Sequence, residues 1–286
     1  MMAEVQQFPG ESFLGRMARI SRARVREARK REPEGALLAR ALAMPAPPPL
    51  RLGTFGMIAE LKYRSPAVGT LAAQDFDGEA QIRSYGAGGA AAVSVLTEPE
   101  EFRGSLDDLR QAAAPLMAFS IPTMRKDFLT DPYQVLEARA AGAGGVLVIV
   151  TMLGDQEVAE LLACAAQCGL FVLLEGFDEA DLERIGGIDA PPDGAAPVLC
   201  GVNCRDLRNL AVSRDRFGQL APYLPSHLPA VAESGIDDAD DIVAVASLGY
   251  RAALVGSALM RAADASQELA AMAAAGAQAV RGEPCS

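Results

Sequence analysis

Lysine is scarce in this chain, and two of its three lysines stand where a positive charge could take part in chemistry. Lys30, Lys62 and Lys126 are the only lysines among 26 basic Lys and Arg residues. Arginine is permanently charged, whereas the pKa of a compact lysine ammonium falls readily on burial. Lys62 and Lys126 each end a short apolar run, so they suggest an acid, a base or a point charge for phosphate. Chance placement is the alternative.

Polar and ionisable residues end most of the other apolar runs as well. Carboxylates beside ammonium groups suit acid–base chemistry on a carbonyl or a hydroxyl: the ammonium protonates an oxygen and a carboxylate removes a proton. A structural core would not bury such groups without partners, because their desolvation is costly. The groups at these ends are Glu60 and Lys62, Thr97 and Glu98, Lys126 and Asp127, Thr151, Glu175, Asn203 and Arg205, Glu233 to Gly235, and Gly256 with Ser257.

The scaffold that must position these groups is predicted by eight apolar runs, each followed by a helical pattern. The runs are continuous rather than alternating, as expected of parallel strands covered on both faces. Eight such units predict a single α/β domain, a (β/α)8 TIM barrel, whose chemistry lies at the carboxyl ends of the strands. A doubly wound sheet is the competitor, but no GxGxxG turn follows the first run. The runs cover residues 57–62, 91–96, 121–126, 145–150, 170–175, 198–203, 230–233 and 252–255.

The last two units add a signal for phosphate binding. Ser234 and Gly235 follow the seventh run, and Gly256 and Ser257 follow the eighth, each in a small-residue turn that enters a helix. Backbone N–H groups at such turns bind phosphate, and barrels often place this site after strands seven and eight. Ser65, after the first run, could supply a further hydroxyl.

Residues outside the eight units predict two flanking segments. Residues 1–50 are expected to form a helical extension, helical over 12–44, with a proline-rich linker that packs on the barrel. Residues 51–275 would form the barrel and residues 276–286 a disordered tail. The run 16–31 holds seven Arg and one Lys against Glu27 alone. It predicts either the solvated face of a helix or a cationic flap over an anionic ligand.

Composition argues against several classes of function. The net charge of −11 disfavours nucleic-acid and anionic-membrane binding. No apolar stretch is long enough for a membrane span and no signal core begins the chain, so a cytoplasmic protein is expected. The five cysteines lack zinc-site spacing and read as buried thiols. His227, the sole histidine, precedes the seventh run, at the wrong end of a barrel, so a Ser-His-Asp triad or a zinc hydrolase is disfavoured.

Several motifs, in order and at barrel spacing over about residues 12–262, resemble those of the indole-3-glycerol phosphate synthase family. The combination of Glu-x-Lys-x-x-Ser-Pro with Arg-Lys-Asp-Phe is the most specific part. The matching segments are IAELKYRSP at 58–66, SVLTE at 94–98, FRGS at 102–105, RKDF at 125–128, GVNCRDL at 201–207, AESGI at 232–236 and VGSALM at 255–260.

The resemblance implies closure of the pyrrole ring of 1-(2-carboxyphenylamino)-1-deoxyribulose 5-phosphate, with loss of CO2 and water, in tryptophan biosynthesis. It implies no metal and no organic cofactor, and we expect a monomer or weak homodimer. Lys126 would be the general acid at the ribulose carbonyl, and Glu175 would act in the dehydration. Glu60 and Asn203 would orient the substrate, and Lys62 would hold its carboxylate or assist proton transfer. The surrounding residues would be Ser65, Ser234, Gly235, Gly256 and Ser257 at the phosphate, Glu233 and Arg205 in support, and Phe102 at the aromatic ring.

Three departures from the family pattern leave room for a specialised paralogue in secondary metabolism. Gly176 and Phe177 follow Glu175 where the family usually has Val-His, Cys204 replaces a usual Asn, and Tyr63 replaces a common basic residue. None removes a predicted proton-transfer group. Two other functions stay open at this point: another phosphate-binding barrel enzyme, such as a sugar-phosphate isomerase or epimerase, and a non-catalytic barrel that binds a phosphorylated ligand.

Overall fold

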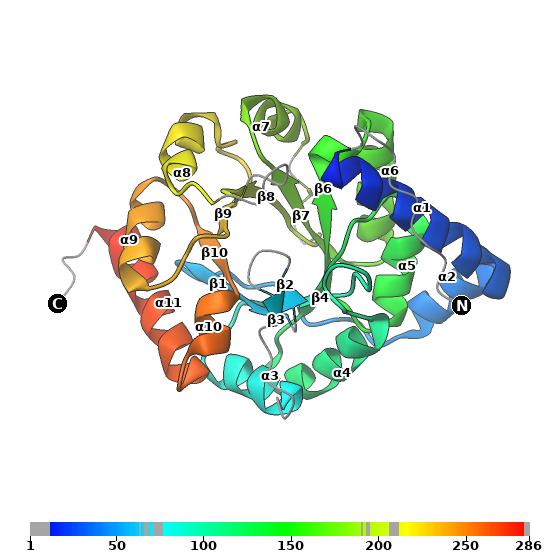
Figure 1. The fold of residues 1–286 in the computed structure, drawn as a ribbon, viewed down its shortest axis with the longest axis horizontal. Coiled ribbons are helices and arrows are strands. Elements are labelled where there is room, and N and C mark those ends of the chain that lie inside the picture. Colours follow the sequence, from blue (N-terminus) through cyan, green and yellow to red (C-terminus); the bar gives the residue numbers. More distant parts are fainter. Residues whose placement is uncertain are drawn as a thin grey trace.

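Eight parallel strands close into a barrel, as the run of apolar segments predicts (Figure 1). The computed structural model describes residues 12–62, 77–189, 191–192, 195–205 and 212–282, and the backbone of 64–65 and 69–70. Neighbours around the barrel follow the chain order, and β10 closes the ring on β1. The barrel strands are β1 (Gly56–Leu61), β4 (Ala92–Leu96), β5 (Thr123–Lys126), β6 (Gly145–Ile149), β7 (Phe171–Gly176), β8 (Val198–Asn203), β9 (Ala230–Glu233) and β10 (Ala252–Val255).

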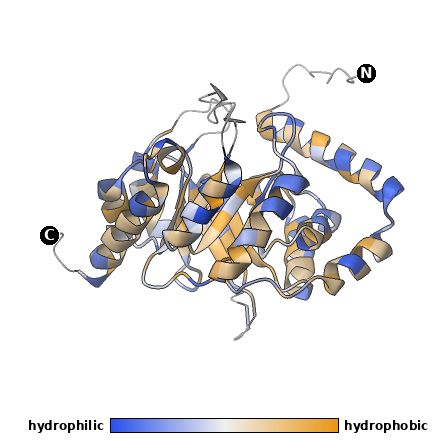
Figure 2. Cartoon of the chain, turned by 90° about the horizontal axis from the view of Figure 1, so that it is seen from below, coloured by the Kyte–Doolittle hydropathy of each residue, from blue (hydrophilic) through white to orange (hydrophobic). Residues whose placement is uncertain are grey.

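Helices surround the barrel, with polar residues on their outer faces and apolar residues toward the strands (Figure 2). Several begin at an acidic or hydroxyl N-cap whose side chain accepts a backbone N–H, as Asp131 does from Tyr133 and Asp178 does from Asp181. The helices after the strands are α3 (Gly78–Ala87), α4 (Leu106–Leu116), α5 (Pro132–Ala140), α6 (Asp155–Gln167), α7 (Glu179–Gly186), α8 (Asp215–Leu220), α9 (Ala239–Ser247), α10 (Ser257–Arg261) and α11 (Ala265–Arg281).

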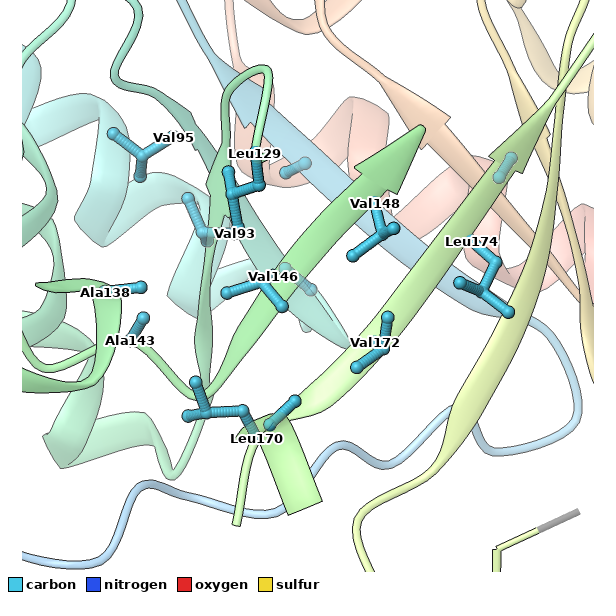
Figure 3. Packing of buried hydrophobic residues seen from close by; sticks show 14 of the residues in the cluster. Val93, Val95, Leu129, Ala138, Ala143, Val146, Val148, Leu170, Val172 and Leu174 are labelled. Carbon is cyan, nitrogen blue, oxygen red and sulfur yellow. The ribbon is translucent and has the colours of Figure 1, made fainter. Parts of the chain in front are cut away.

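Alternation along each strand separates two apolar cores. In β6, Val146 and Val148 pack in the layer between strands and helices, whereas Leu147 and Ile149 belong to a second cluster, with strand residues from around the ring. Figure 3 shows the first layer, with Val93 and Val95 on β4 and Val172 and Leu174 on β7 in addition to the two valines of β6. Both faces of the strands are therefore buried, which explains why the sequence shows continuous apolar runs.

The N-terminal extension is two helices rather than one. The sequence predicts a helix over 12–44, but α1 (Phe13–Arg31) ends at Glu32 and α2 (Glu34–Ala43) begins after Pro33. Proline disfavours helical backbone in the residue before it, which explains the break. Both helices lie outside the ring, beside α5 and α6 (Figure 1).

Helix α1 is joined to the barrel by apolar contacts and by a row of ion pairs. Met17 and Ile20 pack in the same cluster as the inward-facing strand residues. The arginines of the basic run mostly pair with acids on the loops and helices after β4, β5 and β6: Arg16 with Glu101, Arg22 with Glu157, Arg24 with Asp127, and Arg29 with Asp131. The run therefore attaches this helix to the rim of the barrel through four arginines, while Arg26, Lys30 and Arg31 are exposed, as a solvated face predicts.

The C-terminal boundary predicted at residue 275 is wrong. Residues 276–281 are the end of α11, and Gly282 ends it with a left-handed φ of 72°. A Cβ at Gly276 would lie 2.5 Å from the ring of Phe55, so this part of the helix packs closely on the barrel. The rest of the predicted tail, 283–286, lies outside the described residues.

A short antiparallel pair, β2 (Arg64–Ser65) with β3 (Gly69–Thr70), follows β1 and is not predicted by the sequence pattern. It lies outside the barrel sheet. No helix in the described part of the chain has the length and apolar character that crossing a membrane requires.

The pair between Arg24 and buried Asp127 should stabilise the docking of α1. Asp127 accepts two hydrogen bonds from Arg24, at 3.1 and 2.6 Å, and one from Arg125 at 2.9 Å. Because charge-assisted hydrogen bonds to a buried carboxylate are strong, Arg24→Met should lower the free energy of unfolding by about 2 kcal/mol. The matched control, Arg22→Gln, breaks an exposed pair and should cost about 0.5 kcal/mol in urea denaturation. Equal effects would contradict a special role for Arg24.

Candidate active site

A cavity of about 590 Å³ opens at the carboxyl ends of the strands. Its walls include the ends of β1, β5, β7, β8, β9 and β10 and the first residue of α1. Every site residue predicted from the sequence lines this cavity except Ser65, whose side chain lies outside the described residues, as does Tyr63. The predicted residues in the wall are Glu60, Lys62, Phe102, Lys126, Glu175, Asn203, Arg205, Glu233, Ser234, Gly235, Gly256 and Ser257.

At the base of the cavity, the ammonium of Lys126 lies between two buried carboxylates. Its Nζ is 3.1 Å from Oε2 of Glu175 and 3.1 Å from Oε2 of Glu233. The side chains of these two glutamates are 2% and 1% exposed, against 16% for the lysine. The three residues come from β5, β7 and β9, so the barrel alone brings them together.

Charge keeps Lys126 protonated despite its burial. Burial alone would lower the pKa of Lys126, but the carboxylates of Glu175, Glu233 and Glu60 outweigh it and raise the pKa above its ordinary value. The sequence alone suggests that burial lowers the pKa of this lysine, so the observed shift has the opposite direction. Lys126 is therefore protonated and positioned to act as a proton donor. It would release the proton only after the charges around its ammonium group change.

The pKa of Glu233 is raised as well, but by a different cause. Burial raises the pKa of Glu233 above its ordinary value; the charge of Glu175 adds to this and the Lys126 ammonium opposes it. Its Oε1 is buried and has no hydrogen-bond partner among the described residues, which an uncharged carboxyl group tolerates better than an ionised one. One ammonium facing two carboxyl groups thus favours a proton kept on Glu233.

A second lysine–glutamate pair lies at the carboxyl end of β1, with Glu60 in the strand and Lys62 directly after it. Nζ of Lys62 is 2.6 Å from Oε1 of Glu60, and the two side chains are 14% and 5% exposed. Burial would raise the pKa of Glu60, but the Lys62 and Lys126 ammonium groups outweigh it and lower the pKa. Glu60 is therefore an ionised carboxylate between two cations, suited to accept hydrogen bonds or to hold a proton briefly.

Two glycines make room for these carboxylates. A Cβ at Gly201 would lie 2.2 Å from Oε1 of Glu233, and a Cβ at Gly256 would lie 2.6 Å from Oε1 of Glu60. A glycine inside a strand often marks such a close approach. The sequence predicts Gly256 in the site through its turn but not Gly201, although a glycine within a strand is a usable signal.

Turns after β8 and β9 form another wall. Asn203 is opposite Glu233 in the β8–β9 register, and its Oδ1 accepts the backbone N–H of Arg205. Ser234 and Gly235 have left-handed φ values of 68° and 70°. Successive residues in unusual backbone conformations can aim their N–H groups at one point, an arrangement that suits anions.

Three phenylalanines form the opposite, apolar part of the cavity. The ring of Phe128 lies 5.8 Å from that of Phe13 and 6.3 Å from that of Phe102, between centroids. Phe13 comes from α1, Phe102 from the loop after β4 and Phe128 from the loop after β5. Of the three, only Phe102 is predicted as a site residue from the sequence. The motif at 125–128 is a signal for Phe128, and the sequence carries none for Phe13.

Glu98 fixes the loop that carries Phe102. Its buried carboxylate accepts the backbone N–H groups of Glu100, Glu101 and Phe102 at 2.9, 2.6 and 3.2 Å. Arg103, next in the chain, has a left-handed φ of 57°. Glu98 therefore orders a tight turn beside the aromatic wall.

Two departures from the family pattern have structural explanations. A Cβ at Gly176 would lie 2.9 Å from Cβ of Asp181, so glycine lets α7 pack close to the end of β7. The thiol of Cys204 lies 3.1 Å from the carbonyl oxygen of Ser234 and can donate to it. Burial raises the pKa of Cys204 to about 11, so it stays a neutral donor that supports the turn.

His227 lies away from the cavity, as its place before the seventh strand predicts. Its Nε2 is 2.8 Å from the carbonyl oxygen of Ile188, and its side chain is exposed. No group of three or more His, Cys, Asp or Glu residues in the described part of the chain is arranged to hold a metal ion.

Comparison with known proteins decides the family. The model of the indole-3-glycerol phosphate synthase family matches residues 18–272. The chain belongs to this family. It is 46% identical over 214 residues to an indole-3-glycerol phosphate synthase of a Nocardioides species, covering 75% of this chain and 78% of the relative. The corresponding protein of Mycobacterium avium is 41% identical over 243 residues, with 83% and 85% covered.

Solved structures show the same fold at low identity. The 3-hexulose-6-phosphate synthase of Salmonella typhimurium matches with a TM-score of 0.58 at 14% identity, over 80% of this chain and all of that one. The thiamine phosphate pyrophosphorylase of Pyrococcus furiosus matches with a TM-score of 0.56 at 15% identity, over 79% and 98%. Identities this low bear on the barrel architecture alone.

Filling the space beside Glu233 should destabilise the site. Gly201→Ala places a methyl group against Oε1 of Glu233, and overpacking of this kind costs about 1–3 kcal/mol in unfolding free energy. Gly218→Ala, on α8 with open space around it, is the control and should be neutral or stabilising. Chemical denaturation of both variants tests this, and an unchanged stability of Gly201→Ala would contradict the close contact.

The shifted pKa of Glu233 should appear in the pH dependence of stability. Above the unfolded-state pKa of about 4.3, native Glu233 keeps a proton that the unfolded chain has released. The contribution of Glu233 to the free energy of unfolding is therefore fully present below the unfolded-state pKa. It is lost as the pH rises through the pKa of Glu233 in the folded protein. Glu233→Gln removes this contribution, so its unfolding free energy should decline less steeply than that of the wild type above about pH 4.3. Parallel curves would show that Glu233 is ionised in the native state.

Proposed function

We propose that this chain is an indole-3-glycerol phosphate synthase, a lyase that closes the pyrrole ring of 1-(2-carboxyphenylamino)-1-deoxyribulose 5-phosphate in tryptophan biosynthesis. The observation that carries the proposal is the Lys126 ammonium between Glu175 and Glu233, at the base of a cavity with an aromatic wall and an anion-suited wall. The substrate has matching parts: a carboxyphenyl ring, a carbonyl in the middle and a phosphate at the far end.

Binding follows from these two walls. The substrate ring would stack among Phe13, Phe102 and Phe128, and the phosphate would lie on the turns at Ser234–Gly235 and Gly256–Ser257. Ser65 is a further proposed phosphate ligand. Lys62, held by Glu60, would face the ring carboxylate, and Asn203 with Arg205 would support the sugar hydroxyls and the phosphate.

Ring closure needs a proton at the carbonyl oxygen. The ring carbon that carries the carboxylate attacks the ketone carbon, and the carbonyl π electrons move to oxygen as Lys126 delivers its proton. The bond to the carboxylate then breaks, CO2 leaves, and its electron pair restores the aromatic ring. The protonated Lys126 seen between two carboxyl groups suits the first step, because an added negative charge on the substrate oxygen can draw the proton away.

Loss of water completes the reaction. The new hydroxyl leaves as water after taking a proton, and a base removes a proton from the neighbouring carbon to form the pyrrole double bond. Glu175, 3.1 Å from the Lys126 ammonium, is our candidate for this dehydration, with Glu233 as the adjacent proton store. That the enzyme needs no cofactor, works in the cytoplasm and is a monomer or weak homodimer stay predictions.

The assay follows the fluorescence of indole-glycerol phosphate when the pure protein is given the anilino-ribulose phosphate. Lys126→Arg keeps the charge but holds its proton too tightly and has a wider head group, so kcat should fall at least ~10²-fold, the usual scale for a general acid. Lys30→Arg is the matched control: Lys30 pairs with Glu27 on the exposed face of α1 and should turn over normally.

Either of two results would count against the assignment. Wild-type protein without product formation would refute the synthase activity itself. Near-normal turnover by Lys126→Arg would leave the activity standing but refute the acid role of Lys126.

A further inference from the structure

An ion-pair cluster at the cavity mouth has no part in the mechanism above. Arg214, Asp237 and Arg261 line the cavity, and they come from three elements: the segment before α8, the loop after β9 and the end of α10. These are the elements that follow the last three strands. The cluster therefore connects the same loops that carry the Ser234–Gly235 and Gly256–Ser257 turns.

Asp237 binds both arginines at once. Its Oδ2 is 2.7 Å from NH2 of Arg214, and its Oδ1 is 3.1 Å from NH2 of Arg261. Asp241, in the first turn of α9, holds NH1 of Arg214 at 2.7 Å and also accepts the backbone N–H of Asp237 at 2.8 Å. Carboxylates at and just before the start of α9 thus hold the two guanidinium groups in position.

Arg214 also packs against the proposed phosphate turn. A Cβ at Gly235 would lie 3.4 Å from Cγ of Arg214, 2.8 Å from Val212 and 2.9 Å from the sulfur of Cys204. The aliphatic stem of the arginine therefore covers this turn, and its charged end lies beyond it at the mouth.

Both guanidinium groups keep donors for a ligand. Their side chains are 50% and 57% exposed, and each guanidinium has five N–H donors, more than these contacts use. Exposed ion pairs contribute only about 0.2–1 kcal/mol, so a dianionic phosphate can compete for them. The protein as a whole carries a net charge of −11, so an anionic substrate needs a local positive region to approach.

We propose that Arg214 and Arg261 are further substrate-binding residues, which capture the phosphate at the cavity mouth, and that Asp237 is their positioning residue. The inference rests on the proposed function for the identity of the phosphorylated substrate. It assigns the two arginines to binding rather than to chemistry. Their effect should therefore fall on KM and leave kcat unchanged.

Arg214→Gln and Arg261→Gln test the capture role. Each should raise KM for the anilino-ribulose phosphate about 10-fold at low salt with kcat within about twofold of wild type, and high salt should shrink the difference because it screens exposed charges. Arg251→Gln removes the same charge at the opposite end of the barrel, just before β10, and should leave KM unchanged. Equal KM values for all three variants and the wild type would overturn the capture role.

Asp237→Asn tests the positioning role through the sign of its effect. Simple charge removal at the mouth would lower KM, whereas release of two positioned arginines should raise it about threefold. Asp240→Asn, an exposed neighbour on α9, is the control for the charge alone. A lowered KM in Asp237→Asn would overturn the positioning role.

Binding of inorganic phosphate, measured by calorimetry on the wild type and the arginine variants, separates this inference from the proposed function. Weaker phosphate binding in both variants supports capture even if the wild type forms no indole product. Unchanged phosphate binding in both overturns it, even if the synthase assay succeeds.

Discussion

The active site depends on one buried interaction, the ammonium of Lys126 between the carboxyl groups of Glu175 and Glu233. Three ionisable groups at 16%, 2% and 1% exposure would be costly without one another, because each loses its hydration. Placed together, they set each other's protonation: the lysine keeps its proton and Glu233 tends to gain one. The barrel has to supply this geometry from three separate strands, and Gly201 has to leave room for it.

Around this centre the two ends of the proposed substrate would lie against different kinds of structure. The aromatic wall is built from one residue of the extension and two loop residues, and Glu98 fixes one loop through three backbone N–H groups. The anion-suited wall is built from left-handed turns, supported by the Cys204 thiol and the stem of Arg214. The shape of the cavity therefore depends on loop and turn backbone that buried polar side chains hold in place.

The N-terminal helix α1 contributes Phe13 to the cavity wall, and the ion pairs of its arginines hold it on the barrel. A basic run of this kind often stays solvated, yet Arg16, Arg22, Arg24 and Arg29 pair with acids along the rim. One of these acids, Asp127, is next to Lys126 in the chain and has no exposed side-chain surface. Helix docking and the position of the central lysine are thus linked through adjacent residues of β5 and its loop.

The sequence by itself determined the strands, their order and most of the site. Buried parallel strands read as continuous apolar runs, and polar groups such as Lys126 and Glu175 at their ends must converge once the barrel closes. The helix through Arg281, Phe13 in the aromatic wall and the upward pKa shift of Lys126 were decided by the tertiary structure, because each depends on contacts between residues far apart in the chain. The break at Pro33 follows from local backbone sterics, which outweighed the apolar pattern and were already present in the sequence. Burial alone predicts a lower lysine pKa, and only the position of three glutamates in space reverses it.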